Sequence, residues 1–158
     1  MNTAETVTEK IIKKNLSITF MESCTSGLLA SMFTDTSGAS AVFKGSLVTY
    51  SNEMKVAAGV PAQIIEEHGV YSAECARAMA ETVKRIYGAD IAIGITGTTG
   101  NVDPANKDSV LGEAFCCIMF GNEFHDLHIK EDVSRLSRKE IKQRYADRVY
   151  ERLRDLLL

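Results

Sequence analysis

The feature that most limits the fold is an almost wholly apolar run, ADIAIGIT, at residues 89–96. A strand with one solvent-facing side alternates apolar and polar residues, whereas this run has no polar residue between Ile91 and Ile95. Such a strand is buried on both faces, so it lies inside a sheet that helices cover from both sides. The run therefore predicts an α/β fold.

Helical and strand patterns alternate through the rest of the chain. The spacing of apolar residues predicts helices over residues 3–15, 27–35, 52–59, 61–69, 72–88 and 137–156, and further strands over 16–20, 46–50, 110–120 and 123–131. The last two strands are joined by Gly121 and Asn122, a hairpin turn that makes them antiparallel. We expect a single domain over residues 1–158, a three-layer α/β/α fold with a mixed, mostly parallel sheet.

Composition and charge exclude several classes of protein. The 158 residues are 45% hydrophobic and 25% charged, a balance typical of a globular domain and not of a disordered or fibrous chain. No apolar run approaches the roughly 20 residues that cross a bilayer, and the polar first residues lack the core of a secretory signal, so we expect a cytoplasmic protein that does not bind membranes. The net charge of -3 indicates no general attraction to nucleic acid.

Neither the histidines nor the cysteines predict a metal site. His125 and His128 are three residues apart on a predicted strand and therefore face opposite sides. No CxxC pair occurs among the four cysteines, which are Cys24, Cys75, Cys116 and Cys117. We expect reduced thiols, no metal and no cofactor.

Three junctions between strands and helices are unusually polar. They are ESCTSG at residues 22–27, VTYSNEMK at 48–55 and ITGTTG at 95–100. Active sites in open α/β sheets form at such junctions, where strands end and helices begin. The three segments therefore predict a shared site.

Ser23, Tyr50 and Lys55 could together carry nucleophilic catalysis. A serine hydroxyl is a weak nucleophile and needs a base, and a neutral lysine serves this purpose in Ser/Lys enzymes. Lys55 in the first turn of a helix lies in positive potential, which favours the neutral amine, and Tyr50 could relay a proton or orient the pair. The plainer interpretations are a serine helix cap, a core tyrosine and a surface lysine.

The small residues after Ser23 have a second interpretation. Attack on a carbonyl requires hydrogen-bond donors for the oxyanion, and backbone amides at a helix start supply them. We expect the amides of Thr25, Ser26 and Gly27 to have this role.

These motifs resemble the CinA C-terminal domain family, the nicotinamide mononucleotide deamidases. The resemblance lies in ESCTSG, VTYSN, HGVYSAECARAMA, ADIAIGITGTTG and LGEAF, and it extends over nearly the whole chain. It implies a compact α/β/α fold and a metal-independent hydrolysis of nicotinamide mononucleotide to nicotinate mononucleotide and ammonia. It also implies Ser23 as the nucleophile, Lys55 and Tyr50 as proton-handling partners, and a substrate near Thr96 and Gly97. A homo-oligomer is expected.

The chain departs from the family pattern at four places. Ser26 and Ser46 each stand where the family usually has glycine, and TGTTGNVDP at residues 96–104 replaces a glycine-rich loop. The new loop contains Asp103, which would repel a substrate phosphate if it faced the site. Lys142 stands where the family usually has arginine, which keeps the charge but loses the bidentate fork. From local charge, we expect the phosphate partner to be Lys142, Arg144 or Lys107.

Two other functions remain open at this stage. The altered loop is compatible with a non-catalytic relative that binds a nucleotide or a protein partner. The serine and lysine are also compatible with an amidase or esterase for another small substrate.

Overall fold

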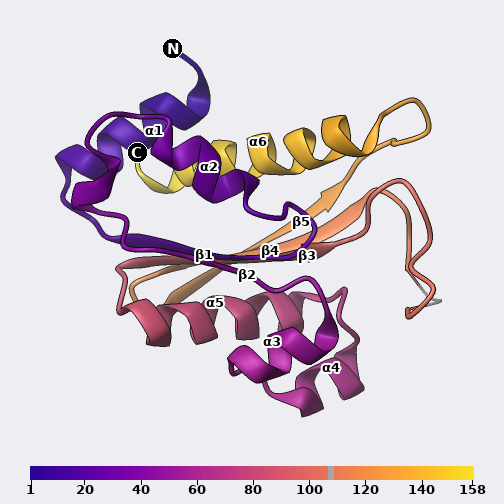
Figure 1. Ribbon diagram of the computed structural model, residues 1–158. Coiled ribbons are helices and arrows are strands. Elements are labelled where there is room, and N and C mark those ends of the chain that lie inside the picture. The colour runs from indigo at the N-terminus through magenta and orange to yellow at the C-terminus, as the bar shows by residue number, and fades with distance from the viewer. Residues whose placement is uncertain (107–108) are drawn as a thin grey trace.

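A five-stranded sheet lies at the centre of the computed structural model, which describes residues 1–106 and 109–158 (Figure 1). The strand order is β2-β1-β3-β4-β5, with bounds Leu47–Val48, Ile18–Glu22, Ile91–Gly97, Glu113–Phe120 and Glu123–Lys130. Both β2 and β3 pair parallel to β1, whereas β4 is antiparallel to both β3 and β5. Four strands therefore run in one direction against β4, which confirms the predicted mixed, mostly parallel sheet.

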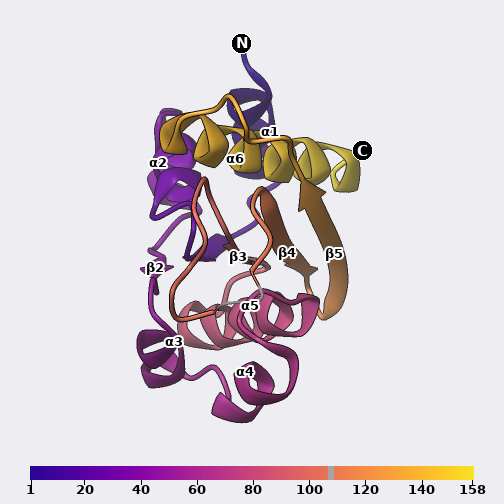
Figure 2. The ribbon, with the colours of Figure 1, turned by 90° about the vertical axis from the view of Figure 1, so that its right-hand side faces the viewer.

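Helices cover both faces of the sheet, as the apolar run of β3 requires (Figures 1 and 2). One layer contains α1 (Thr3–Lys13), α2 (Leu28–Thr34) and α6 (Arg138–Leu156). The other contains α3 (Asn52–Ala58), α4 (Ala62–His68) and α5 (Ala73–Tyr87). A short 3₁₀ turn, η1, spans Ala39–Ala41. Across the described part of the chain, every helix is too short or too polar to cross a bilayer.

Two strands are clearly shorter than predicted. The strand predicted over 110–120 begins at Glu113, because Gly112 has a positive φ of 73° that interrupts the extended backbone. A Cβ at Gly112 would also lie 2.2 Å from the carbonyl oxygen of Glu131, so glycine is required there. The strand predicted over 46–50 is only Leu47–Val48, and the next carbonyl, that of Thr49, accepts a hydrogen bond from Lys55.

Side-chain caps are present at two helix starts. The Ser72 hydroxyl accepts a hydrogen bond from the amide of Cys75 at 3.1 Å. Ser137 and Glu140, at the two ends of the sequence SRKE, form a reciprocal capping box. These caps determine where α5 and α6 begin, beside the ends of the strands.

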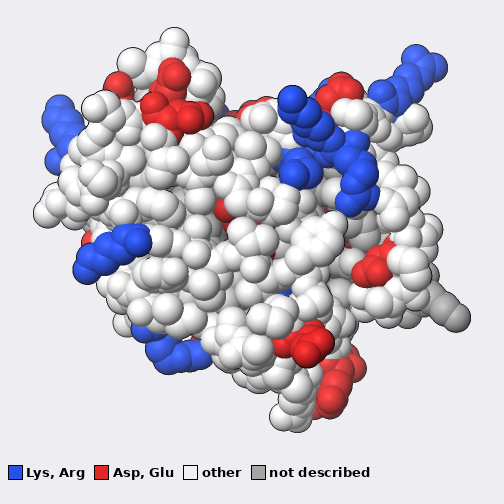
Figure 3. Space-filling model, viewed as in Figure 1, with Lys and Arg blue, Asp and Glu red and all other residues white. Residues whose placement is uncertain are grey.

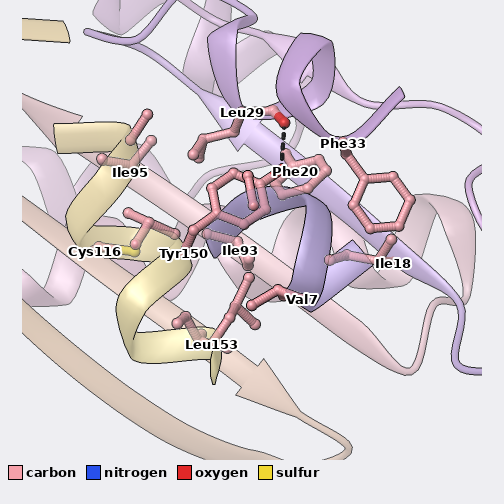
Figure 4. Packing of buried hydrophobic residues seen from close by; sticks show 14 of the residues in the cluster. Val7, Ile18, Phe20, Leu29, Phe33, Ile93, Ile95, Cys116, Tyr150 and Leu153 are labelled. Atoms are coloured by element: carbon pink, nitrogen blue, oxygen red, sulfur yellow. Dashed lines mark hydrogen bonds between the residues drawn. The ribbon is translucent and has the colours of Figure 1, made fainter. Parts of the chain in front are cut away.

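The larger of two apolar clusters lies between the sheet and the layer of α1, α2 and α6. Figure 4 shows Phe20 of β1 packed among residues of these helices and of β3. Tyr150 of α6 is fully buried, and its hydroxyl donates a 2.7 Å hydrogen bond to the carbonyl oxygen of Leu29 in α2. This bond satisfies a buried carbonyl and joins the two helices.

The second cluster depends on a close approach between α5 and β3. A Cβ at Gly94 would lie 2.4 Å from the carbonyl oxygen of Ala76 and 2.7 Å from the amide nitrogen of Ala80. Both neighbours are backbone atoms of one helix, so a side chain could not be accommodated without moving α5. Gly94 therefore sets how closely this helix lies on the sheet.

We expect Gly94→Ala to lower the free energy of unfolding by about 3 kcal/mol or more, because the added methyl group overpacks a helix against a strand. Urea denaturation measures this change. Gly121→Ala is the control, since a Cβ added there would have nothing within 4 Å and only the positive φ of 61° opposes the substitution. Equal losses in the two variants would contradict the role assigned to Gly94.

Candidate functional site

The candidate site lies at the carboxyl ends of β1, β2 and β3, the edge that faces the viewer in Figure 2. The chain leaves β1 toward α2 in one helical layer and leaves β2 toward α3 in the other. A crevice opens between neighbouring strands whose connections diverge in this way, and ligands of α/β proteins bind there. A cavity of about 380 Å³ occupies this position.

Residues from five separate segments line this cavity. Ser23 follows β1, Tyr50 follows β2, and Lys55 comes from α3. Gly97 ends β3, and the segment after it contributes Asp103. Arg138 comes from the start of α6, and Tyr71 comes from the segment that leads into α5. The structure thus brings Ser23, Tyr50, Lys55 and Gly97 to one cavity, as the sequence analysis expects.

Ser23 and Lys55 form a direct, buried contact. The Lys55 Nζ lies 3.0 Å from the Ser23 Oγ and donates a 2.8 Å hydrogen bond to the carbonyl oxygen of Thr49. Lys55 is only 1% exposed and Ser23 6% exposed. Lys55 is therefore not a surface lysine. Ser23 is not the cap of α2, because the residue that precedes this helix is Gly27.

Burial lowers the pKa of Lys55 below its ordinary value. The nearby thiols of Cys75 and Cys24 would oppose this effect as thiolates, but burial raises their own pKa values to about 11 and about 12. Asp103 is the remaining opposing charge, and it raises the pKa of Lys55. Desolvation, and not the helix start that the sequence suggests, is therefore the main cause of the lowered pKa of Lys55.

Tyr50 lies at the rim of the cavity and does not have the position of a core aromatic. It is 62% exposed, and its hydroxyl accepts a 3.2 Å hydrogen bond from Nη2 of Arg138. The same guanidinium also donates to the Asn101 side chain. Among the described contacts, none joins the Tyr50 hydroxyl to Ser23 or Lys55.

The expected oxyanion amides are placed differently. The carboxylate of the buried Glu22 accepts hydrogen bonds from the amides of Leu29 at 2.8 Å and Ala30 at 3.1 Å and from the Thr25 hydroxyl at 2.7 Å, so it occupies the start of α2. The Ser26 amide donates to the carbonyl oxygen of Ser23 at 3.0 Å.

None of Thr25, Ser26 and Gly27 is among the described residues that line the cavity. Ser26 and Gly27 both have positive φ, 47° and 100°, and turn the chain away from the cavity before α2 begins. The usual family glycine at position 26 suits this backbone, because a left-handed φ favours glycine.

Two more of the expected site residues lie outside the described lining of the cavity. The Thr96 hydroxyl is buried and donates to the carbonyl oxygen of Val70 at 3.0 Å, so it ties β3 to the segment before α5 and does not reach the cavity. Lys142 also lies outside the described lining, while Arg138, one helical turn earlier, lies within it. Lys107, an alternative phosphate partner, lies outside the described residues.

Sequence reasoning missed Arg138 and Tyr71 as site residues. Arg138 precedes Lys142 by four residues, so the two share a helix face, and this spacing could have identified it. Tyr71 had no signal of its own beyond its place in the HGVYSAE motif. Metal ligands are a separate matter: within residues 1–106 and 109–158, no group of three or more His, Cys, Asp or Glu residues could hold an ion.

Comparisons with known proteins identify the relatives of this chain. A sequence profile of the CinA C-terminal domain matches residues 1–157. Protein MG115 of Mycoplasma genitalium is 34% identical over 155 residues, which cover 98% of this chain and 96% of that protein. A CinA-like protein of Fervidobacterium nodosum is 40% identical over 107 residues, which cover 67% of this chain but only 26% of that longer protein.

A solved structure has the same fold. The competence/damage inducible protein CihA from Agrobacterium tumefaciens superposes with a TM-score of 0.85 at 25% sequence identity. The match covers 100% of this chain and 98% of that one. All layers of the fold described above are therefore shared with this protein.

We expect the stability of the wild type relative to Lys55→Met to rise with pH. The unfolded chain keeps the Lys55 proton up to about pH 10.4. The folded chain releases it at lower pH, because burial lowers the pKa of Lys55. Between these two values the unfolded state binds more protons, so folding becomes more favourable as pH rises.

Urea denaturation at about pH 6 and about pH 9.5 measures this difference, and effects common to both proteins cancel in it. Lys139→Met, at an exposed position, is the control for loss of a lysine. A difference between wild type and Lys55→Met that does not change with pH would contradict a shifted Lys55.

Proposed function

The chain belongs to the CinA C-terminal domain family, and from that premise we propose that it hydrolyses the carboxamide of nicotinamide mononucleotide to nicotinate mononucleotide and ammonia. One observation carries the proposal: the buried 3.0 Å contact between the Ser23 Oγ and the Lys55 Nζ at an open cavity. A serine in contact with a desolvated amine is the pairing that nucleophilic attack on an amide requires.

The reaction begins with attack by Ser23. Neutral Lys55 accepts the hydroxyl proton as the Ser23 Oγ bonds to the carboxamide carbon. In the neutral amine, the hydrogen bond from Nζ to the Thr49 carbonyl oxygen leaves the lone pair able to face the serine. The resulting tetrahedral intermediate carries negative charge on the former carbonyl oxygen.

The amide of Cys24 is the donor that we assign to this oxyanion, because the residue after a nucleophile commonly supplies one in α/β hydrolases. Cys24 also lines the cavity. Its thiol is not a competing nucleophile, since burial raises the pKa of Cys24 to about 12 and keeps it protonated.

The Lys55 ammonium then returns its proton to the leaving nitrogen, which departs as ammonia and leaves an ester on Ser23. Water, deprotonated by neutral Lys55, attacks this ester and releases the carboxylic acid. Every proton in the cycle passes through one amine, so no second titrating side chain is needed.

Arg138 is the partner that we assign to the substrate phosphate, in place of Lys142. Its guanidinium lies at the rim of the cavity and can form two parallel hydrogen bonds to a phosphate. Figure 3 shows Lys and Arg atoms gathered over the N-terminal part of α6, which adds positive potential on this side of the molecule. The helix start itself favours an anion as well.

Ser23→Ala is expected to lower ammonia release from nicotinamide mononucleotide by at least about a thousandfold, because the nucleophile is lost. The exposed Ser37→Ala serves as the control and should release ammonia at the wild-type rate. Unchanged turnover by Ser23→Ala would remove Ser23 as the nucleophile. A folded wild-type protein that binds the substrate without releasing ammonia would favour the non-catalytic alternative.

Arg138→Met is expected to raise KM for nicotinamide mononucleotide by about 10-fold to 100-fold, equivalent to roughly 1–3 kcal/mol of a charged hydrogen-bonded pair, with little change in kcat. Lys142→Met, outside the described lining, should change KM much less. Nicotinamide riboside, which lacks the phosphate, should respond weakly to either variant. A larger effect from Lys142→Met than from Arg138→Met would reverse the assignment.

A further inference from the structure

Asp103 is a charged residue of the cavity that the proposed mechanism does not use. Its Oδ2 accepts hydrogen bonds from the Tyr71 hydroxyl at 2.6 Å and from the Asn106 amide at 2.7 Å. Its Oδ1 accepts a hydrogen bond from the backbone amide of Ala105 at 2.9 Å. Three donors thus hold the carboxylate in one orientation at the cavity wall.

The Asp103 carboxylate is negatively charged at neutral pH. The hydrogen bonds from Tyr71 and Asn106 stabilise the ionised form and lower the pKa of Asp103. The phenol keeps its proton, because burial and the Asp103 hydrogen bond raise the pKa of Tyr71. Tyr71 therefore remains a donor over the physiological range.

Two aromatic side chains accompany this charge. Tyr71 and Tyr50 both line the cavity together with Asp103. Aromatic faces and a carboxylate attract the same kind of ligand, a flat organic cation. A neutral ring placed here would remove water from an ionised carboxylate without replacing the lost charge interaction, which costs free energy.

The charge on Asp103 also reaches the reacting groups. It raises the pKa of Lys55, which shows that the carboxylate and the amine share one electrostatic environment. A bound cation would offset the Asp103 charge and would thereby favour the neutral amine that attack by Ser23 requires.

We propose that Asp103 is a specificity-determining residue of this cavity, which favours a carboxamide on a positively charged aromatic ring over the same carboxamide on a neutral ring. The proposal rests on the proposed function, whose substrate carries an N-substituted pyridinium ring, and it adds the residue that recognises this charge. Combined with Arg138 at the rim, it describes a cavity for a zwitterion, with a cationic ring toward Asp103 and an anionic group toward α6.

Binding of two small probes tests the proposal without relying on turnover. 1-Methylnicotinamide is a cation, whereas 6-methylnicotinamide has the same ring, carboxamide and number of methyl groups but is neutral. Neither probe carries a phosphate, so Arg138 does not contribute. Ligand-observed NMR titration gives the two Kd values for each protein variant.

The wild type should bind the cation about fivefold to tenfold more tightly than the neutral probe. Asp103→Asn, which keeps the shape and an acceptor for Tyr71, should bring this ratio close to one. Asp126→Asn is the matched control, because Asp126 is a carboxylate on β5 paired with Arg77 outside the described lining, and it should retain the wild-type ratio.

A preference for the cation that persists in Asp103→Asn would overturn the proposal, as would a wild type without preference or without binding of either probe at millimolar concentration. Tyr71→Phe keeps the Asp103 charge but removes one hydrogen-bond donor to it, so this variant should still prefer the cationic probe. It thereby separates the effect of the charge from an effect on the structure of the loop. Failure of the proposed function would be seen separately. In that case the protein would release no ammonia from nicotinamide mononucleotide but would still bind the cationic probe more tightly than the neutral one.

Discussion

The burial of one amine determines what this structure can do. Lys55 is held on the inside of the domain by Ser23 and by the Thr49 carbonyl oxygen, and desolvation lowers its pKa. A buried lysine reduces folding stability, since a charged amine loses its water there. The domain accommodates it because both strands that lead to the site, β1 and β3, are buried along their whole length and position Ser23 and Gly97 from a well-packed core. Stability elsewhere in the core thus supports a costly group at the cavity.

Much of the fold could be predicted from local patterns. The buried run of β3 requires two helical layers, and cap residues such as Ser72 and Ser137 mark helix starts within a residue or two. The strand ends were less predictable, because they depend on contacts distant in sequence. Gly112 lies just before β4 and against the Glu131 carbonyl oxygen, and no pattern within either segment indicates this contact.

The parts of the site in which one residue type chemically implies another could be predicted from the sequence. The parts in which the three-dimensional arrangement selects among several suitable residues could not. A serine after one strand and a lysine after another suggest each other chemically, and the structure places them in contact. The amides of Thr25 to Gly27 were equally suitable by sequence, but Glu22 occupies the helix start and two positive φ angles turn the chain away. Arg138 and Lys142 share a helix face, and only the position of α6 on the sheet selects between them.

The contact between α5 and Gly94 also affects the dimensions of the cavity. Tyr71 immediately precedes the Ser72 cap of α5, and the Val70 carbonyl oxygen is bonded to Thr96 near the end of β3. Tyr71 is thereby held against β3 in two ways. The hydrogen bond between Thr96 and the Val70 carbonyl oxygen is one, and the packing of α5 on the backbone at Gly94 is the other. The absence of a side chain at Gly94 therefore sets the width of the cavity. A bulkier residue at position 94 would require a wider cavity or a shifted Tyr71.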